Sequence, residues 1–331
     1  MKILIRLPNW LGDVVMSTAF VASVRQLYPD STIDVIIKNE LADLAKLIPD
    51  IQAIHLFSKQ DYKGLTGAHQ FGKKLRGENY DLFFNLPSSL TSLILAWATG
   101  AKKRVGFTKE GGFFLLTDKF KRPSGLHRVD EYIFLLEQFT GKVIHDKKVR
   151  LNIDKSAEQN KNRIVVNFNS EAASRRMPLD KGKTIINLLT NTFPHPTFTF
   201  IGSAGEAGFV ERLIEKAENK DRIENFAGKT NLAGLCHLIA GAAAVLTTDS
   251  GPAHLANSIG TPTVVLFGAG NELNTAPYNK SNLCILRYGH LKCEPCVKNT
   301  CKLYNIPKCM ELIDELQIID ALATSCISIE R

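Results

Sequence analysis

Residues 245–267 read VLTTDSGPAHLANSIGTPTVVLF, and this stretch predicts one complete unit of a parallel α/β sheet. It opens and closes on short apolar runs rich in β-branched residues, which are typical of buried strands. Asp249 and Ser250 are favoured helix N-caps, Pro252 suits a first helical turn, and Gly260 suits a helix end. The turn therefore lies after a strand and before a helix. Open α/β sheets bind ligands at that position, where free N–H groups favour anions.

The same stretch resembles the C-terminal signature of the family 9 glycosyltransferases, the ADP-heptose:lipopolysaccharide heptosyltransferases. That signature is D-[ST]-G-x-x-H-x-A-x-x-x-G-x-P-x-x-x-L-F-G. The residues that match it in register are Asp249, Ser250, Gly251, His254, Ala256, Gly260, Pro262, Leu266, Phe267 and Gly268. The resemblance implies that Asp249, Ser250, Gly251 and His254 bind the nucleotide-sugar donor. Without it, Asp249 reads equally well as a helix cap and His254 as a core histidine.

Length and composition favour a two-domain protein with an anionic partner. A chain of 331 residues is too long for a single hydrophobic core and suits two domains of about 150 residues each. No apolar run reaches the ~18 residues of a membrane span, and the N-terminus lacks a signal peptide's cleavage site. We therefore expect a cytoplasmic protein. The net charge of +8 suits nucleotide phosphates, nucleic acid or an anionic lipid surface.

Alternating strands and helices predict a doubly wound sheet in each half of the chain. We predict a strand over residues 2–7 that leads through a turn into one long helix. A second series starts with a strand at 163–168, after a polar linker at 154–162. With the resemblance, this implies the GT-B architecture, two Rossmann-like doubly wound domains facing across a cleft. Its parts are a Rossmann-like acceptor-binding domain (1–153), a Rossmann-like nucleotide-sugar-binding domain (163–310) and a closing C-terminal helix (311–331).

The N-terminal turn carries a second resemblance to the same family. The family opening is R-x-x-x-x-G-D-x-x-x-x-x-P. The sequence N-W-L-G-D at residues 9–13 of this chain most resembles the heptosyltransferase II branch. Five residues rather than four separate Arg6 from Gly12, and Ala19 stands in place of the proline. The resemblance implies that Asp13 is the general base for the acceptor hydroxyl and that Arg6 binds the acceptor. The alternative is that Asp13 only caps the first helix.

Further loops of the second half resemble donor-binding loops of the family. Arg175 takes the place of the basic residue in a family loop that ends K-x-W-P, with Met177 in place of the tryptophan. The resemblance implies that Arg175 holds the donor diphosphate and neutralises the leaving group, with Arg176 as the alternative cation and Ser170 as an added hydroxyl. The loops FAGKT and GSAGE add Lys229, Thr230, Gly202 and Glu206 to the donor set. The alternative interpretations are that Lys229 is an ordinary exposed lysine and that Glu206 is an exposed glutamate at the start of a helix.

Two basic clusters lie in the first half, at residues 102–104 and 119–122. The family acceptor is an anionic, membrane-borne lipid core, so we expect Lys103 and Arg104 to contact it and the clusters to meet the inner membrane. The alternative is a solvated face.

The cysteines at positions 293, 296, 301 and 309 form a C-x2-C-x4-C-x7-C pattern. Cys293, Cys296, Cys301 and Cys309 would suffice for a tetrahedral structural zinc site. Disulfides and unligated thiols are the alternatives. The reaction itself needs no cofactor, and no D-x-D triplet for a catalytic metal occurs in the sequence.

Together these observations imply an inverting glycosyltransferase that moves heptose from ADP-heptose to the inner core of lipopolysaccharide. One alternative is another nucleotide sugar as the donor of the same family. A nucleic-acid-binding protein is an alternative from a different class, motivated only by the net charge, and we expect no nucleic-acid partner. A dinucleotide-dependent oxidoreductase is disfavoured, because only one glycine follows the first predicted strand before the helix.

Overall fold

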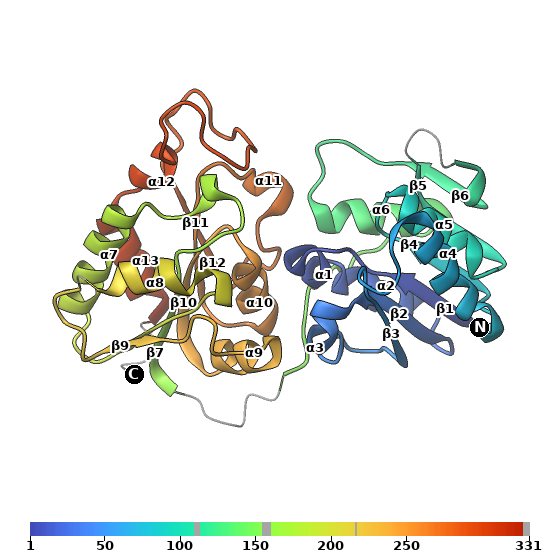
Figure 1. Ribbon diagram of the computed structural model, residues 1–331, viewed down its shortest axis with the longest axis horizontal. Coiled ribbons are helices and arrows are strands. Elements are labelled where there is room, and N and C mark those ends of the chain that lie inside the picture. Colours follow the sequence, from blue (N-terminus) through green and yellow to red (C-terminus); the bar gives the residue numbers. More distant parts are fainter. Residues whose placement is uncertain (109–112, 154–159, 216, 327–331) are drawn as a thin grey trace. The chain divides into compact units, whose positions relative to one another are not determined.

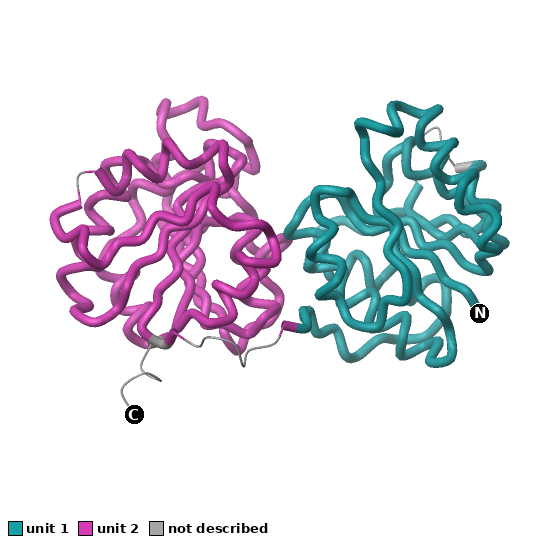
Figure 2. Tube along the Cα trace, turned by 60° about the horizontal axis from the view of Figure 1, so that its bottom comes forward, with its two compact units in different colours: residues 1–152 teal, residues 153–331 magenta. Residues whose placement is uncertain are grey.

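The computed structural model describes residues 1–108, 113–153, 160–215 and 217–326. The chain divides into two compact units, Met1–Asn152 and Ile153–Arg331 (Figure 2). Each unit contains a six-stranded sheet in which every pair of neighbouring strands is parallel, with helices between successive strands (Figure 1). This confirms the doubly wound α/β class. Most of the predicted linker, at 154–159, lies outside the described residues.

Unit 1 has the strand order β3-β2-β1-β4-β5-β6. Its strands are β1 (Lys2–Arg6), β2 (Thr32–Lys38), β3 (Ala53–Phe57), β4 (Leu82–Asn85), β5 (Lys103–Thr108) and β6 (Asp118–Lys121). Its helices are α1 (Leu11–Met16), α2 (Thr18–Leu27), α3 (Ala42–Ala45), α4 (Gly64–Lys74), α5 (Leu90–Ala98) and α6 (Arg128–Thr140), with short 3₁₀ turns η1 (Asn39–Leu41), η2 (Arg76–Glu78) and η3 (Phe113–Leu115). The central strands β1 and β4 are apolar on both faces and almost wholly buried, as helices on both sides of a parallel sheet require.

Unit 2 has the strand order β12-β11-β10-β7-β8-β9. Its strands are β7 (Asn160–Asn167), β8 (Thr197–Phe200), β9 (Ile223–Asn225), β10 (Ala242–Thr248), β11 (Thr263–Phe267) and β12 (Leu283–Arg287). Its helices are α7 (Leu179–Thr192), α8 (Ala207–Ile214), α9 (Leu232–Ala240), α10 (Gly251–Ile259), α11 (Glu272–Thr275), α12 (Lys308–Glu311) and α13 (Glu315–Cys326), with 3₁₀ turns η4 (Ala173–Arg175) and η5 (Ala204–Glu206). The core of this unit is built from the inner strands, α7, α8 and α13.

The stretch at 245–267 folds as the sequence predicts. It forms β10, α10 and β11, and Val245 lies opposite Thr263 in a parallel pair. Gly260 ends α10 with φ 88°, the left-handed conformation that glycine adopts without a steric penalty.

Two predicted helices have different bounds in the structure. The long N-terminal helix breaks between α1 and α2, where the Ser17 and Thr18 hydroxyls donate to the carbonyls of Val14 and Val15 at 2.7 and 2.8 Å. Such bonds from Ser and Thr to the preceding turn bend helices. The closing helix predicted over 311–331 begins later, because α12 ends at Glu311 and α13 starts at Glu315; residues 327–331 lie outside the described part of the chain.

Three edge elements were not predicted from the sequence: β6, β9 and β12. Every described residue of β9 and β12 is only partly buried, and β6 alternates between partly buried and exposed residues. The strands β6 and β9 are short and polar, so they lack the continuous apolar run that marks a central parallel strand, whereas β12 has such a run, Leu283 to Leu286, within a segment predicted to be irregular. No helix within the described residues is long and apolar enough to cross a membrane.

In each sheet the chain reverses its winding direction at one point. We call these the first switch point, beyond the carboxyl ends of β1 and β4, and the second switch point, beyond the carboxyl ends of β7 and β10. Open α/β sheets bind ligands in the crevice that such a reversal creates.

Candidate active site

A buried polar network joins the loops that follow β7 and β10 at the second switch point. Asn167 Nδ2 donates to Thr247 Oγ1 at 3.1 Å and to Ser250 Oγ at 2.9 Å. Thr248 Oγ1 donates to the carbonyl of Asn169 at 2.5 Å, and Asn169 Nδ2 donates to the backbone after β8 at 2.9 Å. These bonds between side chains and backbone tie together the loops that follow three strands, as expected where polar groups are buried.

The helix N-terminus of α10 opens onto this network. Ser250 is the N-cap residue, but its side chain makes no capping bond to the helix. Its hydroxyl instead donates to the carbonyl of Thr248 at 3.0 Å and accepts from Asn167. The N–H groups at the start of α10 therefore lack a capping side chain, which favours binding of an anion at this end of the helix.

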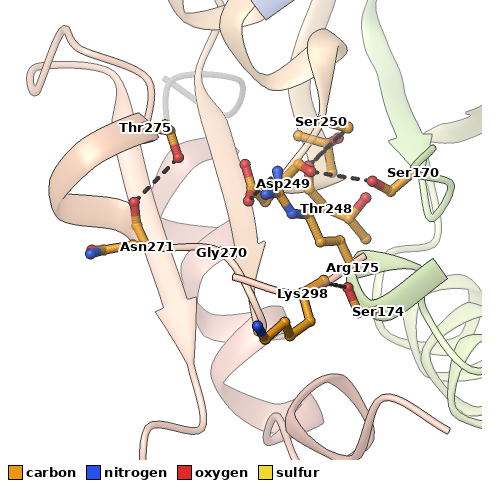
Figure 3. A network of polar contacts seen from close by, with 12 residues as sticks. Ser170, Ser174, Arg175, Thr248, Asp249, Ser250, Gly270, Asn271, Thr275 and Lys298 are labelled. Carbon is orange, nitrogen blue, oxygen red and sulfur yellow. Dashed lines mark hydrogen bonds and ion pairs between the residues drawn. The ribbon is translucent and has the colours of Figure 1, made fainter. Parts of the chain in front are cut away.

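Asp249 and Arg175 form an ion pair beside this helix N-terminus (Figure 3), with 3.1 Å between Asp249 Oδ2 and Arg175 Nη1. Asp249 is 3% exposed, and burial raises the pKa of its carboxyl to about 6, although the Arg175 and Arg287 guanidiniums oppose that rise. Asp249 Oδ2 also lies against Gly270, where any Cβ would overlap it. Asp249 Oδ2 is thus engaged by Arg175 and enclosed by Gly270, whereas the buried Arg175 Nε has no hydrogen-bond partner among the described residues.

The structure distinguishes Arg175 from its neighbour. Arg176 donates to the carbonyl of Ser170 at 3.0 Å, and its guanidinium lies 5.3 Å from the centre of the Phe209 ring. It therefore supports the loop after β7, whereas Arg175 reaches Asp249. Ser170 is buried in the same loop, and its hydroxyl lies 3.5 Å from the Asp249 carbonyl.

The other predicted donor residues lie at the same edge of the sheet, and they differ in burial and in their contacts with the rest of unit 2. Gly202, after β8, is close enough to the Asn169 amide that a side chain there would displace it. Glu206 accepts from the backbone and hydroxyl of Ser203 at 2.8 Å, so its carboxylate serves a capping box. Lys229 is exposed and Thr230 partly buried, in the loop after β9, and His254 is buried on α10.

At the first switch point, Asp13 lies in the first turn of α1 with a side chain that is 23% exposed. Its Oδ1 is 3.5 Å from Arg128 Nε at the start of α6. Burial raises the pKa of Asp13, and the Arg128 and Arg122 guanidiniums act in the opposite direction. Arg128 also donates to Glu131 at 2.9 Å, so this carboxylate shares its arginine with a second one.

The predicted acceptor residues make contacts within unit 1, with Arg6 at the carboxyl end of β1 beside the first switch point. Arg6 is 4% exposed, and it donates to the carbonyls of Leu7 and Ile36 and to the side chain of Asn9; burial lowers its pKa to about 10. Its guanidinium is thus engaged within the fold. Lys103 and Arg104 lie at the amino end of β5, away from the switch point. Arg104 donates to two backbone carbonyls there, and Lys103 lies over the ring of Phe139.

Several residues at the two switch points were not predicted as site residues from the sequence: Asn167, Asn169 and Gly270 in unit 2, and Arg128 and Glu131 in unit 1. Arg122 was predicted only as part of the basic cluster at 119–122, and it lies 3.7 Å from Glu131. The only signal for the asparagines is the N-F-N run directly after an apolar strand. No spacing in the sequence indicates that the start of α6 lies beside Asp13, because that contact depends on the sheet order.

The four cysteines of the C-x2-C-x4-C-x7-C pattern are free thiols in the structure. Cys309 is buried, which raises its pKa to about 11, and Glu294, Cys296 and Cys301 raise it further. Among the described residues, no three His, Cys, Asp or Glu side chains are gathered as a metal site requires. The arrangement therefore gives no support to the predicted zinc site, which stays a prediction.

The structure has two doubly wound units, with a helix N-terminus beside a paired arginine in one and a partly exposed carboxylate in the other, and these features fit the GT-B class of glycosyltransferases. Comparison with known proteins gives the family. The chain belongs to glycosyltransferase family 9 (heptosyltransferase), whose family model matches residues 68–306.

Named relatives agree with this assignment. The chain is 27% identical to the lipopolysaccharide core heptosyltransferase OpsX of Haemophilus influenzae over 81% of this chain and 79% of that protein. It is 26% identical to lipooligosaccharide heptosyltransferase 2 of Campylobacter jejuni over 97% of each. Among solved structures, the Escherichia coli ADP-heptose lipopolysaccharide heptosyltransferase II is similar with a TM-score of 0.84, 21% identity and 100% coverage of both chains.

Proposed function

We propose that this protein transfers heptose from ADP-heptose to the inner core of lipopolysaccharide with inversion at the anomeric carbon. The family assignment and the heptosyltransferases among its relatives support the sugar and the acceptor. The observation that carries the proposal is the Asp249–Arg175 pair beside the start of α10, because it combines a cation with a helix N-terminus that has no capping side chain at a switch point.

At the second switch point, the α10 N-terminus and Arg175 stabilise the negative charge that develops on ADP as the bond to the sugar breaks. Ser170, Ser250 and Gly251 line the same corner and contact the phosphates. Asp249 and His254 orient the donor sugar and phosphates, Asp249 through its ion pair with Arg175. Gly202, Glu206, Lys229 and Thr230 belong to the nucleotide side of the site.

Asp13 acts on the acceptor. Its carboxylate takes the proton of the attacking hydroxyl while that oxygen bonds to the anomeric carbon and the bond between that carbon and the diphosphate oxygen breaks. A direct displacement of this kind inverts the anomeric centre. The Arg128 guanidinium at 3.5 Å orients the carboxylate. The step needs no cofactor.

We also propose that unit 1 contacts the inner membrane at its cytoplasmic face, where an anionic lipid acceptor is held. The support is α5, which carries no charged residue and still exposes Leu90 and Trp97 at 45% and 50%. Arg76 lies against Gly100 just beyond the end of this helix, and Lys102 follows. An apolar face beside basic residues suits the surface of an anionic bilayer.

A thermal-shift screen against nucleotide sugars and ADP tests the proposal. We expect ADP-heptose to raise the melting temperature more than other nucleotide sugars at equal concentration, because a ligand stabilises the fold it binds. A larger shift with another nucleotide sugar would assign a different donor within the family. No shift with any nucleotide would contradict the proposed function.

A further inference from the structure

The cysteine-rich segment, residues 292–302, is hydrogen-bonded to the loops that hold the Asp249–Arg175 pair. Val297 N–H donates to the carbonyl of Ala269 at 2.8 Å, and Ser174 N–H donates to the carbonyl of Asn299 at 3.1 Å. The Ser174 hydroxyl donates to the carbonyl of Lys298, as Figure 3 shows. Three consecutive residues of the segment thus bind two separate loops of the site.

These two loops are the ones that touch the Asp249 carboxylate. Ser174 directly precedes Arg175 in the short turn η4 and is 1% exposed. Ala269 directly precedes Gly270, which packs against Asp249 Oδ2. A single 3₁₀ turn has little stability of its own, so the backbone of Arg175 depends on bonds to its surroundings. The N–H and the hydroxyl of Ser174 both donate to the cysteine-rich segment.

The backbone of Val297 indicates that this connection is maintained against a conformational cost. Its φ is 52°, in the left-handed region that β-branched residues rarely adopt. Its side chain is 57% exposed, so burial of the side chain does not explain the conformation. Strained backbone persists where surrounding contacts over-determine it, and the described contact here is the bond to Ala269.

We propose that residues 297–299 are a clamp that positions Arg175 for the donor diphosphate, with Ser174 as the positioning residue. The inference rests on the proposed function, since it takes the diphosphate as the ligand of Arg175. It gives the cysteine-rich segment a role that requires no bound metal: its backbone holds the turn η4 at a fixed distance from Asp249.

The test is a double-mutant cycle on ADP affinity, measured by calorimetry. Ser174→Ala removes one hydroxyl, and we expect it to weaken ADP binding about three- to tenfold in the otherwise unchanged protein. In an Arg175→Ala background the same change should alter affinity less than about twofold, because the residue through which it acts is absent. Thr190→Val is the matched control, since it removes a buried hydroxyl of unit 2 that donates to the Asn187 carbonyl within α7.

A second variant keeps the test decisive if Ser174→Ala lowers the yield of folded protein. Val297→Pro removes the N–H that binds Ala269 and, because proline fixes φ near about −65°, also abolishes the left-handed backbone at this exposed position. It should therefore break the connection to Ala269 and weaken ADP binding only when Arg175 is present. Equal losses with and without Arg175, or no loss in either variant, would overturn the clamp while wild-type ADP binding remained intact. Absence of ADP binding by the wild-type protein would instead overturn the proposed function.

Discussion

The two switch points share a topology and a residue pair but differ in exposure. Each places an aspartate beside an arginine just beyond a central strand: Asp13 with Arg128 at 3.5 Å, and Asp249 with Arg175 at 3.1 Å. The Asp13 side chain is 23% exposed and its arginine is shared with Glu131, whereas the Asp249 side chain is 4% exposed and lies against Gly270.

This difference separates two kinds of carboxylate within one fold. A carboxylate that must meet an incoming hydroxyl needs an open side, and Asp13 has one. A carboxylate that holds an arginine toward a diphosphate needs fixed geometry, and burial against Gly270 provides it for Asp249.

The largest effect is expected from Asp13→Asn. An amide cannot accept the proton of the attacking hydroxyl, so kcat should fall by about 10²- to 10⁴-fold while ADP affinity stays within about twofold of the wild type. Product formation and calorimetry measure the two quantities. Turnover close to that of the wild type would remove Asp13 as the base.

The next largest effect is expected at the other arginine–aspartate pair. Arg175→Ala should weaken ADP binding about ten- to a hundredfold, since it deletes a cation bonded to phosphate. Arg176→Ala is the matched neighbour and should cost much less, because Arg176 faces Phe209 and the carbonyl of Ser170. A larger loss for Arg176→Ala would exchange the two roles.

Stability should depend on pH through Asp249. Its folded pKa of about 6 exceeds its ordinary value of 3.8, so the folded state holds the proton more tightly and loses stability as pH rises through 6. Relative to Asp249→Asn, the wild-type free energy of unfolding should fall by about 2 kcal/mol between pH 4.5 and 7.5. Denaturant titrations of both proteins measure this difference. Parallel pH profiles would contradict the burial argument.

A smaller effect is expected outside both switch points. Trp97→Ser should weaken binding to anionic lipid vesicles about three- to tenfold, because α5 loses apolar contact area, and should leave ADP affinity unchanged. Leu273→Ser is the control, since Leu273 is a 77% exposed leucine in unit 2. Equal vesicle binding by Trp97→Ser and the wild type would remove α5 from the proposed membrane contact.

Sequence patterns predict the centre of each unit well and its surroundings poorly. The unit at 245–267 and the turn at Asp13 form where they are predicted, because apolar strands, caps and glycine act locally. The contacts of Asp13 with Arg128 and of Asp249 with Gly270 join residues far apart in the chain, and they follow from the sheet order. The charge of a residue likewise does not indicate its contacts within the fold. Arg6 and Arg104 donate to backbone carbonyls, and Lys103 lies over an aromatic ring, although all three were predicted from their charge to bind the acceptor.

Hydrogen–deuterium exchange of the whole protein with and without ADP tests the central claim most directly, that the second switch point holds the donor diphosphate. We expect ADP to slow exchange in peptides that contain residues 167–176 and 249–255, because these segments carry Ser170, Arg175 and the start of α10. Protection confined to other segments, with these two unchanged at saturating ADP, would contradict the assignment.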